Sequence, residues 1–439
     1  MPRPKQRTLT IKVDALARVE GESALFIKAR DGQPREVRFA IFEPPRFFEA
    51  FLRGREHAEA PDITARICGI CPVAYQMSAC NAMESLFGVL VSPELRRLRL
   101  LLYFGEWVES HTLHVAFLHA PDFLGYDSAL AMAKDHPEMV RKALQLKKTG
   151  NQLITLIGGR EIHPINVRVG GFYSAPRPRD LDRLRGPLRQ ALDIAQQMAS
   201  WVAGFEFPDF EQDYEFVALH HPEEYAILEG RIISNRGIDV PVSHFDDVFV
   251  EQQVPHSNAL HATVKGRGSY MVGPLARFNL NFDQLSPLAK QVARSAGVVP
   301  PVRNPFKSIV VRSVEIVHAI DVALRLFDRY EPPERAWMDY TVRAGVGYGA
   351  SEAPRGMLYH RYRVGGDGLI EDARIVPPTS QNQKCIEDDL WRFAPRVLTM
   401  PKNEATWLCE QAIRNYDPCI SCATHFLRLM VDDERDART

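Results

Sequence analysis

The sequence has no apolar run that approaches the roughly 18–20 residues needed by a membrane-spanning helix. Its N-terminus carries basic residues without a following apolar segment, which disfavours a secretory signal. Neither sign of charge is in excess, since 54 Lys and Arg residues face 55 Asp and Glu residues and the formal net charge is −1. This balance argues against binding to nucleic acid or to a membrane surface through bulk charge.

Internal repeats, low-complexity tracts and a convincing linker are also lacking. The chain has 439 residues, 45% of them hydrophobic, so it can bury a large core. We therefore expect one domain over residues 1–439, with no string of modules. Its predicted class is α+β: a large helix-rich domain with a central bundle of long helices and small peripheral β-sheets.

The apolar periodicity places these elements along the chain. Residues 7–43 alternate apolar and polar positions around a turn at 31–34, so residues 1–45 should form a β-rich part. Ser92-Pro93 is a typical helix start, and this helix is predicted to reach His119 and end at Pro121. Further helices are predicted at 128–148, 180–204, 305–330 and 403–415, a loop at 160–175, and a hairpin at 355–376. The pattern over 207–300 predicts no definite structure.

The chain carries seven cysteines, and an odd number in a long chain without an export signal disfavours a disulfide framework. Metal binding or redox chemistry is the better expectation. The cysteines are Cys68, Cys71, Cys80, Cys385, Cys409, Cys419 and Cys422.

Two Cys-x-x-Cys pairs stand near opposite ends of the chain, within Arg66–Pro72 and Asp417–His425. Each pair places two soft sulfur donors a few ångströms apart, which suits zinc, iron–sulfur clusters and other late transition metals. Common zinc modules separate such pairs by roughly 12–20 residues, whereas almost the whole chain lies between these two. On spacing alone, a structural zinc site or a thiol redox site is as good an interpretation as a catalytic metal.

The residues around the cysteines decide between these interpretations. Arg-x-Cys-Gly-x-Cys near the N-terminus and Asp-Pro-Cys-x-x-Cys-x-x-His near the C-terminus resemble the paired signatures of nickel–iron hydrogenase large subunits. Segments 18–21, 158–164 and 352–356 match as well, so the resemblance covers nearly the whole chain. It implies that family's large-subunit fold and the reversible heterolytic cleavage of H2. The respiratory complex I relative of this family lacks the metal cysteines, whereas all four are present here.

The resemblance also implies a role for each cysteine of the two pairs. Cys68 and Cys419 are expected as terminal thiolates on nickel. Cys71 and Cys422 are expected to bridge nickel to an iron that carries carbon monoxide and cyanide. Cys80, Cys385 and Cys409 match no role in the family, and buried structural thiols are expected there.

Other side chains match positions around the metal centre. Cys419 is expected to act as the base that takes the proton and passes it to Glu20, which would otherwise be interpreted as a surface carboxylate ending a strand. Arg355 is expected over the open metal site, where its cation could polarise H2. Asp417 is expected near Arg355, although it could also act as a turn cap.

Further matches concern the surroundings of that centre. Pro378 and Thr379 match the segment that contacts the cyanide ligands, with Thr379 as a hydrogen-bond donor, and Asp122 is expected near the metals. His111 and His114 share a helix face at i, i+3. That spacing could indicate a metal site, but histidines of the core or of the metal surroundings are more common.

Two further expectations depend on the resemblance. Glu49 and His425 match the ligands of a second ion, magnesium or an additional iron, and oxygen and imidazole donors suit a buried hard cation. His163 lies in a loop that faces the small subunit in the family, so it is assigned to partner contact. The polar tail 426–439 resembles a C-terminal extension that an endopeptidase removes once nickel is inserted; a native tail is the alternative.

The chain has no Gly-x-Gly-x-x-Gly fingerprint and no cysteine set for an iron–sulfur cluster. Electrons must therefore leave through partners: a small subunit with iron–sulfur clusters, then flavin and NAD(P) subunits. A maturation endopeptidase and nickel chaperones are further implied partners. The amino-acid sequence of residues 353–360 and 377–382 resembles that of cytoplasmic, bidirectional, NADP-linked enzymes, some of which reduce sulfur.

The sequence is also compatible with other functions. Within the same family, deazaflavin- or NAD-linked enzymes and hydrogen sensors are alternatives. A scaffold subunit or structural metal protein is an alternative of another class, although intact metal cysteines argue against it. A thiol oxidoreductase would usually need a thioredoxin-like βαβ unit, and the sequence predicts none.

Overall fold

The computed structural model describes residues 8–30, 33–43 and 47–424. The longer helices are α3 (Pro72–Phe87), α4 (Pro93–Thr112), α7 (Pro137–Gly158), α8 (Pro178–Ala203), α12 (Ser308–Asp328), α13 (Pro378–Val397) and α14 (Lys402–Arg414). The shorter helices are α1 (Phe48–Leu52), α2 (Ala60–Thr64), α5 (Ala120–Leu124), α6 (Ala129–Met132), α9 (Phe245–Val248), α10 (Pro274–Asn281), α11 (Pro287–Ser295) and α15 (Ile420–Ala423). Within these residues, none of the helices combines the length and apolar character that crossing a bilayer requires.

The strands form small antiparallel sheets, and in each three-stranded sheet the strands follow one another in chain order. The three-stranded sheets contain β1 (Thr8–Val13), β2 (Ser23–Arg30) and β3 (Gln33–Ile41); β6 (Val217–His220), β7 (Arg231–Ser234) and β8 (Asp239–Val240); and β11 (Gly345–Ala353), β12 (Gly356–Val364) and β13 (Ile370–Val376). The two-stranded sheets pair β4 (Val167–Arg168) with β5 (Gly171–Phe172), and β9 (Phe249–Gln252) with β10 (His261–Val264).

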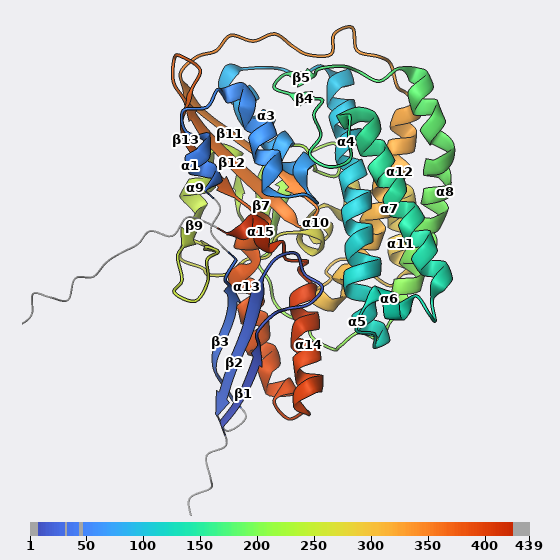
Figure 1. Cartoon of the computed structure of the whole chain (residues 1–439), viewed down its shortest axis with the longest axis vertical. Coiled ribbons are helices and arrows are strands. Elements are labelled where there is room, and N and C mark those ends of the chain that lie inside the picture. The colour runs from blue at the N-terminus through green and yellow to red at the C-terminus, as the bar shows by residue number, and fades with distance from the viewer. Residues whose placement is uncertain (1–7, 31–32, 44–46, 425–439) are drawn as a thin grey trace, which may run out of the picture.

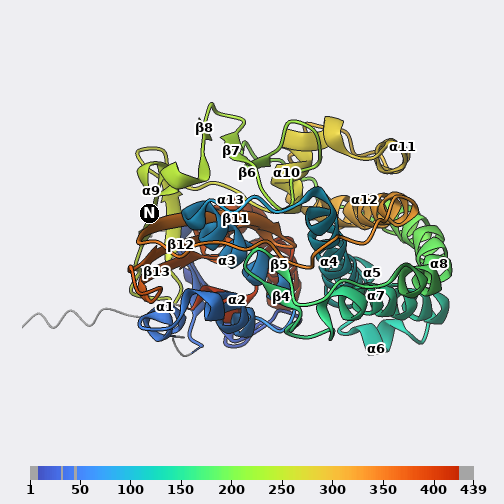
Figure 2. The ribbon, with the colours of Figure 1, turned by 90° about the horizontal axis from the view of Figure 1, so that it is seen from above.

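Four long helices, α4, α7, α8 and α12, pack side by side as a bundle at one end of the molecule (Figures 1 and 2). Gly105 on α4 and Gly150 on α7 mark their closest approach. A Cβ at Gly105 would lie 3.1 Å from the Gly150 carbonyl oxygen, and a Cβ at Gly150 only 2.8 Å from the Gly105 oxygen. Only glycine lets the two backbones meet this closely. The predicted central bundle of long helices is therefore confirmed.

The other half of the molecule is built around α3 and α13. The sheet β11–β12–β13 packs against α3, and α13 packs against β3, β10 and α14 (Figures 1 and 2). At Gly349 on β11, a Cβ would lie 2.4 Å from the Ser78 carbonyl oxygen of α3, so this sheet touches the helix backbone. The α+β class is confirmed. Helix α3 begins directly after Cys71, and the first turn of α13 contacts Cys419.

Several predicted bounds differ from the structure. The helix predicted at 128–148 is two helices. Pro137 begins α7, and the residue before a proline rarely adopts the helical backbone conformation, so the preceding helix cannot run through it. Ser92 caps α4 as predicted, by accepting a hydrogen bond from Leu95 N. The α-helix, however, ends at Thr112 and continues as a π-helical segment over Leu113–His119. Pro121 lies in the first turn of α5, where its missing N–H is not needed.

Candidate metal centre

The structure brings the two cysteine pairs together although almost the whole chain separates them. Cys68 Sγ lies 3.6 Å from Cys419 Sγ, and Cys71 Sγ lies 3.8 Å from Cys422 Sγ. Four sulfurs bound tetrahedrally to one ion at about 2.3 Å would be about 3.8 Å apart. Cys419 and Cys422 Sγ are closer, at 2.6 Å, yet all four thiols are free and buried. Their sulfurs lie within 4.8 Å of one another.

The N-terminal pair is held by the start of α3. Cys71 is the residue before this helix, and Pro72 occupies its first turn. The carboxylate of Glu106 on α4 accepts hydrogen bonds from Val73 N at 2.6 Å and Ala74 N at 3.1 Å. These are amides that a helix start leaves without intrahelical partners. Glu106 thereby fixes the direction in which α3 leaves Cys71.

The C-terminal pair is held by the segment that contains Glu20. Ile420 N donates a hydrogen bond to the Glu20 carbonyl at 2.9 Å, and Glu20 pairs with Cys419 as a parallel bridge. Gly21 has a φ of 88°, and a Cβ there would lie 2.6 Å from Ile420 Cβ. A side chain at position 21 would therefore push the C-terminal segment away from Glu20.

The Glu20 side chain reaches the centre itself. Its Oε2 lies 3.2 Å from Cys419 Sγ and accepts a hydrogen bond from Ser421 N at 2.9 Å. The thiol of Cys419 is thus in direct hydrogen-bond contact with a half-buried carboxylate. A proton on this sulfur can pass to the carboxylate without an intervening group.

The protonation of the four thiols is uneven. The pKa of Cys68 is lowered because its sulfur accepts hydrogen bonds from Cys419 and from the other two thiols. Burial raises the pKa of Cys419 and of Cys422. Four thiolates cannot all carry charge in one buried space unless a cation is present. The set therefore suits a metal ion that takes sulfur ligands.

Arg355 provides a fixed cation beside the sulfurs. Its Nε donates to the Asp417 carbonyl at 2.7 Å and its Nη2 to Asp417 Oδ1 at 3.1 Å. Burial opposes this charge, but Asp417 and the Cys419 sulfur outweigh it and raise the pKa of Arg355. Its Nη1 is buried and has no hydrogen-bond partner among the described residues. Arg355 can therefore donate a further hydrogen bond to a group bound at the centre.

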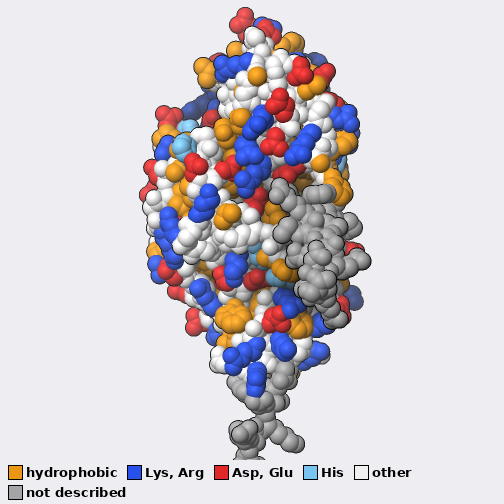
Figure 3. All heavy atoms as spheres, turned by 90° about the vertical axis from the view of Figure 1, so that its left-hand side faces the viewer, with side chains coloured by type: hydrophobic (Ala, Val, Ile, Leu, Met, Phe, Trp, Pro, Cys, Tyr) orange, Lys and Arg blue, Asp and Glu red, His pale blue; other side chains and the backbone are white. Residues whose placement is uncertain are grey.

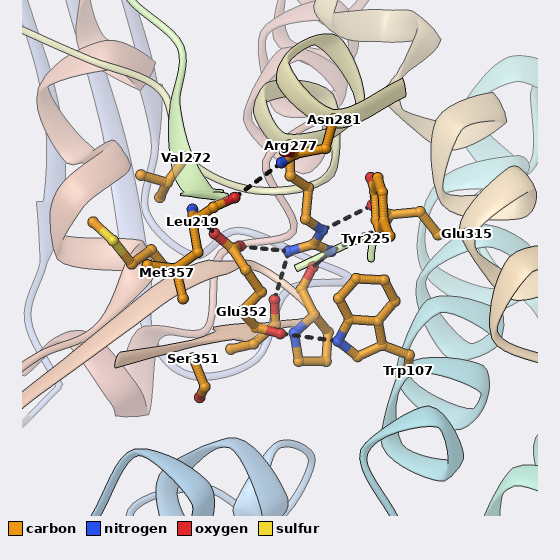
Figure 4. Close-up of polar contacts among 12 residues, drawn as sticks. Trp107, Leu219, Tyr225, Val272, Arg277, Asn281, Glu315, Ser351, Glu352 and Met357 are labelled. Atoms are coloured by element: carbon orange, nitrogen blue, oxygen red, sulfur yellow. Dashed lines mark hydrogen bonds and ion pairs between the residues drawn. The ribbon is translucent and has the colours of Figure 1, made fainter. Parts of the chain in front are cut away.

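A buried charge network supports the segment that leads to Arg355. Figure 4 shows the Arg277 guanidinium between Glu315 and Glu352, with the ring of Trp107 beneath it. Arg277 Nε lies 2.8 Å from Glu315 Oε1 and Nη1 3.1 Å from Glu352 Oε2. The guanidinium also donates to the carbonyls of Ala353 at 2.8 Å and Pro354 at 3.0 Å. These bonds hold the two residues that precede Arg355.

Replacing Arg277 with methionine is expected to destabilise the protein strongly. The change leaves the Glu315 and Glu352 carboxylates buried without their cation, a loss that typically costs about 3–5 kcal/mol. The control is Arg231→Gln, which removes an exposed pair with Asp239 and should cost less than about 1 kcal/mol. Urea unfolding of the purified chains measures both, and equal midpoints for the two variants would contradict the role of this network.

Thr379 and Asp122 hold the backbone around the centre. Thr379, in the first turn of α13 beside Pro378, accepts a hydrogen bond from Cys419 N at 3.0 Å. Asp122 receives bonds from Arg414 Nε at 2.7 Å and Nη2 at 2.8 Å, and it also pairs with Arg18. Asp122 thereby joins the segments that lead to Glu20 and to Asp417.

Tyr416, next to Asp417, is anchored by Asp389 of α13. Asp389 Oδ2 accepts hydrogen bonds from the Tyr416 hydroxyl at 2.6 Å and the Tyr214 hydroxyl at 2.7 Å. Burial raises the pKa of Asp389 to about 7 from an ordinary 3.8. The folded state therefore binds this proton more tightly than the unfolded state does.

This raised pKa predicts a pH dependence of stability. The contribution of protonated Asp389 is fully present below about pH 4 and is lost as the pH rises through about 7. Asp389→Asn keeps a neutral side chain at every pH. The wild type should therefore lose stability relative to this variant between pH 4 and 7, as measured by urea midpoints. The exposed control Asp239→Asn should show no such trend, and a constant difference for Asp389→Asn would exclude the raised pKa.

Of the remaining expected residues, Glu49 and His163 belong to the described residues and His425 does not. Glu49 Oε1 accepts a hydrogen bond from Ile375 N at 2.7 Å, whereas His425 lies outside the described residues. His163 is half-buried, and its Nδ1 lies 2.7 Å from the carbonyl oxygen of Ala65, close to Cys68 in the chain. The ion at Glu49 and His425 and the partner contact of His163 stay predictions.

His111, on α4, and His114, in the π-helical segment that follows it, contact protein groups. His111 Nε2 lies 2.9 Å from Glu315 Oε2, and His114 Nε2 lies 2.8 Å from the Arg414 carbonyl oxygen. Burial lowers the pKa of His111 to about 4 and that of His114 as well, so both rings are neutral at neutral pH. Neither is in a group of metal ligands among the described residues.

Some site residues were missed by the sequence interpretation. Glu106, Arg277 and Arg312 are buried and hold backbone segments at the centre; Arg312 Nη1 donates to the Asn415 carbonyl at 3.0 Å. The available signal was the placement of Glu106 and Arg312 within otherwise apolar helical segments. Charged residues on such helices are almost never fully buried unless they are paired.

The residues present fit a metal group. Four soft donors are buried within 4.8 Å of one another, and an orphaned Arg355 N–H adjoins them. Thiolate donors suit late transition metals. The fold and the site thus define a metalloprotein whose metal centre is held by thiolates. The two cysteine pairs that form it come from the N-terminal and C-terminal parts of the chain.

Comparisons with known proteins identify the family. A family model described as nickel-dependent hydrogenase matches residues 46–140. The alpha subunit of sulfhydrogenase 1 from Pyrococcus furiosus is 33% identical over 97% of this chain and all of its own length. The beta subunit of the NAD-reducing hydrogenase HoxS from Cupriavidus necator is 28% identical over 95% of both chains. A solved NAD+-reducing NiFe hydrogenase in the H2-reduced state superposes with a TM-score of 0.86 at 26% identity, covering 95% of this chain and 99% of that one.

The chain belongs to the nickel-dependent hydrogenase family. It is the large subunit of a nickel–iron hydrogenase, an oxidoreductase that acts on H2, and its four clustered cysteines are positioned to hold the Ni–Fe centre. The relatives above are named as subunits of larger enzymes, and this large subunit accordingly works with partner chains.

Proposed function

We propose that this chain splits H2 reversibly at a nickel–iron centre to which Cys68 and Cys419 would supply thiolate ligands for nickel. Cys71 and Cys422 would complete the thiolates that hold the nickel and an iron with carbon monoxide and cyanide ligands. When bound, this group supplies the site where H2 is cleaved heterolytically and where the electrons enter. The observation that carries the proposal is the contact of Cys419 Sγ with Glu20 Oε2 at 3.2 Å, inside a buried set of four sulfurs.

The side chains around the centre have separate roles in moving the proton and in holding the centre in place. Cys419 Sγ holds the proton, and Glu20 Oε2 receives it on the way to solvent. Arg355 is fixed by two bonds to Asp417 and keeps an N–H without a partner among the described residues; this N–H would donate to a group bound at the centre. Thr379 holds the Cys419 backbone beside Pro378, and Asp122 joins the segments on either side.

Electrons leave through an iron–sulfur small subunit, and NAD(P) is the proposed acceptor, reached through flavin subunits. The likeness to the NAD+-reducing structure supports this acceptor. His163 contacts the small subunit, and Glu49 with His425 binds a magnesium or iron ion. A nickel chaperone and an endopeptidase complete maturation in the cytoplasm. Mature protein should accordingly end at His425 by intact mass.

Infrared spectroscopy of the purified complex tests the proposal. Stretching bands of metal-bound carbon monoxide and cyanide are expected, and they should shift when H2 is added. Matured protein that contains zinc alone and gives no such bands would overturn the assignment and favour a structural metal protein.

A further inference from the structure

A second group of ligand atoms lies outside the thiolate centre. His256, His261 and Glu387 each place one ligand atom within 4.8 Å of the others. His256 lies in the loop before β10, His261 begins β10, and Glu387 lies on α13. The side chains of His261 and Glu387 are only 4% and 10% exposed, and that of His256 is 20% exposed.

The protein alone does not satisfy the polar atoms of this group. Glu387 Oε1 accepts from His256 Nε2 at 2.8 Å and from Phe39 N at 3.0 Å. His261 Nδ1 lies 3.9 Å from Glu387 Oε2, too far for a hydrogen bond. The other nitrogen of His261, Nε2, is buried without a partner among the described residues. Leaving a buried polar ring unpaired in this way costs free energy.

The charge state of the group also suits a cation. A neutral imidazole offers a lone pair to a metal ion, and the buried Nε2 of His261 has no other partner among the described residues. The nearby cationic side chains are paired with carboxylates, which reduces their repulsion of a bound ion. Lys384 is paired with Asp388, and Arg38 with Glu36. A hollow of about 500 Å³ that is lined by His256, Glu387 and Trp391 gives an ion a route from solvent.

We propose that His256, His261 and Glu387 bind a divalent transition-metal ion, with Zn²⁺ as the ion that the donor set fits best. Two imidazoles and one carboxylate are ligands that zinc uses, whereas magnesium and calcium sites consist mainly of oxygen donors. Ligand atoms around tetrahedral zinc are about 3.3 Å apart, so small side-chain rotations close the set. The site is separate from the thiolate centre and independent of the proposed hydrogenase mechanism.

The ion would tie together segments that close the thiolate centre. Glu387 is on the helix whose first turn holds Cys419 through Thr379. The loop between the two histidines contacts the N-terminal sheet and the segment after Cys422. Asn258 N donates to the carbonyl of Ile41, the last residue of β3, at 2.7 Å, and Ala259 pairs with Thr424. The role is therefore structural: it fixes the N-terminal sheet, this loop and α13 relative to one another.

Zinc binding to the matured complex tests the site, because nickel and iron then occupy the thiolates. Wild type, incubated with Zn²⁺ and desalted, should retain one additional zinc whose X-ray absorption shows only nitrogen and oxygen neighbours at about 2.0 Å. His261→Gln and His256→Gln should lose this zinc; the second variant changes a partly exposed ring and leaves the core intact. The exposed control His244→Gln should retain it.

Further arms separate the other possible sources of binding. Glu49→Gln should keep the zinc, and loss of zinc in this variant alone would place the ion at the Glu49 site and overturn the proposal. Sulfur neighbours at about 2.3 Å, or no retained zinc in wild type, would also overturn it. Zn²⁺ should raise the melting temperature of wild type and not of His256→Gln. Hydrogenase activity and infrared bands, recorded on the same samples, report separately on the proposed function.

Discussion

Replacing Cys419 with serine is expected to leave the chain unable to retain nickel. Cys419 is fully buried, and its sulfur contacts the sulfurs of Cys68 and Cys422. A serine hydroxyl in the same place is a harder donor that stays protonated, so one of the soft ligands is lost. Changes that touch only the surroundings of a metal site commonly cost about 10–100-fold in metal affinity or activity. Loss of a direct ligand should exceed that range.

Nickel content by elemental analysis and H2 oxidation by the purified complex measure this effect. The matched control is Cys409→Ser, a buried thiol on α14 outside the cluster, whose pKa burial raises to about 12. This control should keep its nickel and most of its activity. Serine at position 419 with full nickel content would contradict the ligand role, and nickel loss in both variants would indicate a general folding defect.

The two halves of the centre could be predicted from sequence because each is a short continuous motif. Cys68 with Cys71 and Cys419 with Cys422 each lie within one turn, and the residues around them carry a family signature. Glu20 could be placed for the same reason. Their convergence could be expected from the resemblance, but their distances depend on how Gly21 and Glu106 position the two segments.

The supporting network could not be predicted, because its members depend on non-local packing. Arg277 on α10 meets Glu315 of α12 and Glu352 of β11 only in the folded protein. Glu315, like Arg312, lies in an otherwise apolar helical segment, but no local rule predicts which buried cation it meets. The same holds for His256 and Glu387, which are brought together by the packing of β10 on α13.

The face of the molecule shown in Figure 3 agrees with the charge balance of the sequence. Figure 3 shows Lys and Arg side chains interspersed with Asp and Glu side chains on the face that it displays. Inside the protein, Arg277, Arg355 and Arg414 are buried and paired with carboxylates. In this interior a proton needs a dedicated acceptor near the metal, because water reaches the buried sulfurs only sparingly.

Glu20→Gln should keep the metal centre and slow proton transfer by about 100- to 10,000-fold, the range of general acid–base catalysis. A glutamine oxygen can still accept the hydrogen bond from Ser421 N, which Glu20 Oε2 accepts at 2.9 Å, so the local backbone should persist. The amide, however, cannot take up the proton from Cys419 Sγ. Metal content and infrared bands should therefore match wild type.

Exchange between H2 and D2O isolates this step, because it requires proton transfer at the centre and no external electron acceptor. Glu22→Gln is the matched control, since its carboxylate is exposed two residues further along the same segment. It should exchange at the wild-type rate. Glu20→Asp should fall between the two, because the carboxylate is kept but its reach to Cys419 is shorter by one methylene. Wild-type exchange in Glu20→Gln would reject the relay from the sulfur to this carboxylate and require another acceptor for the proton.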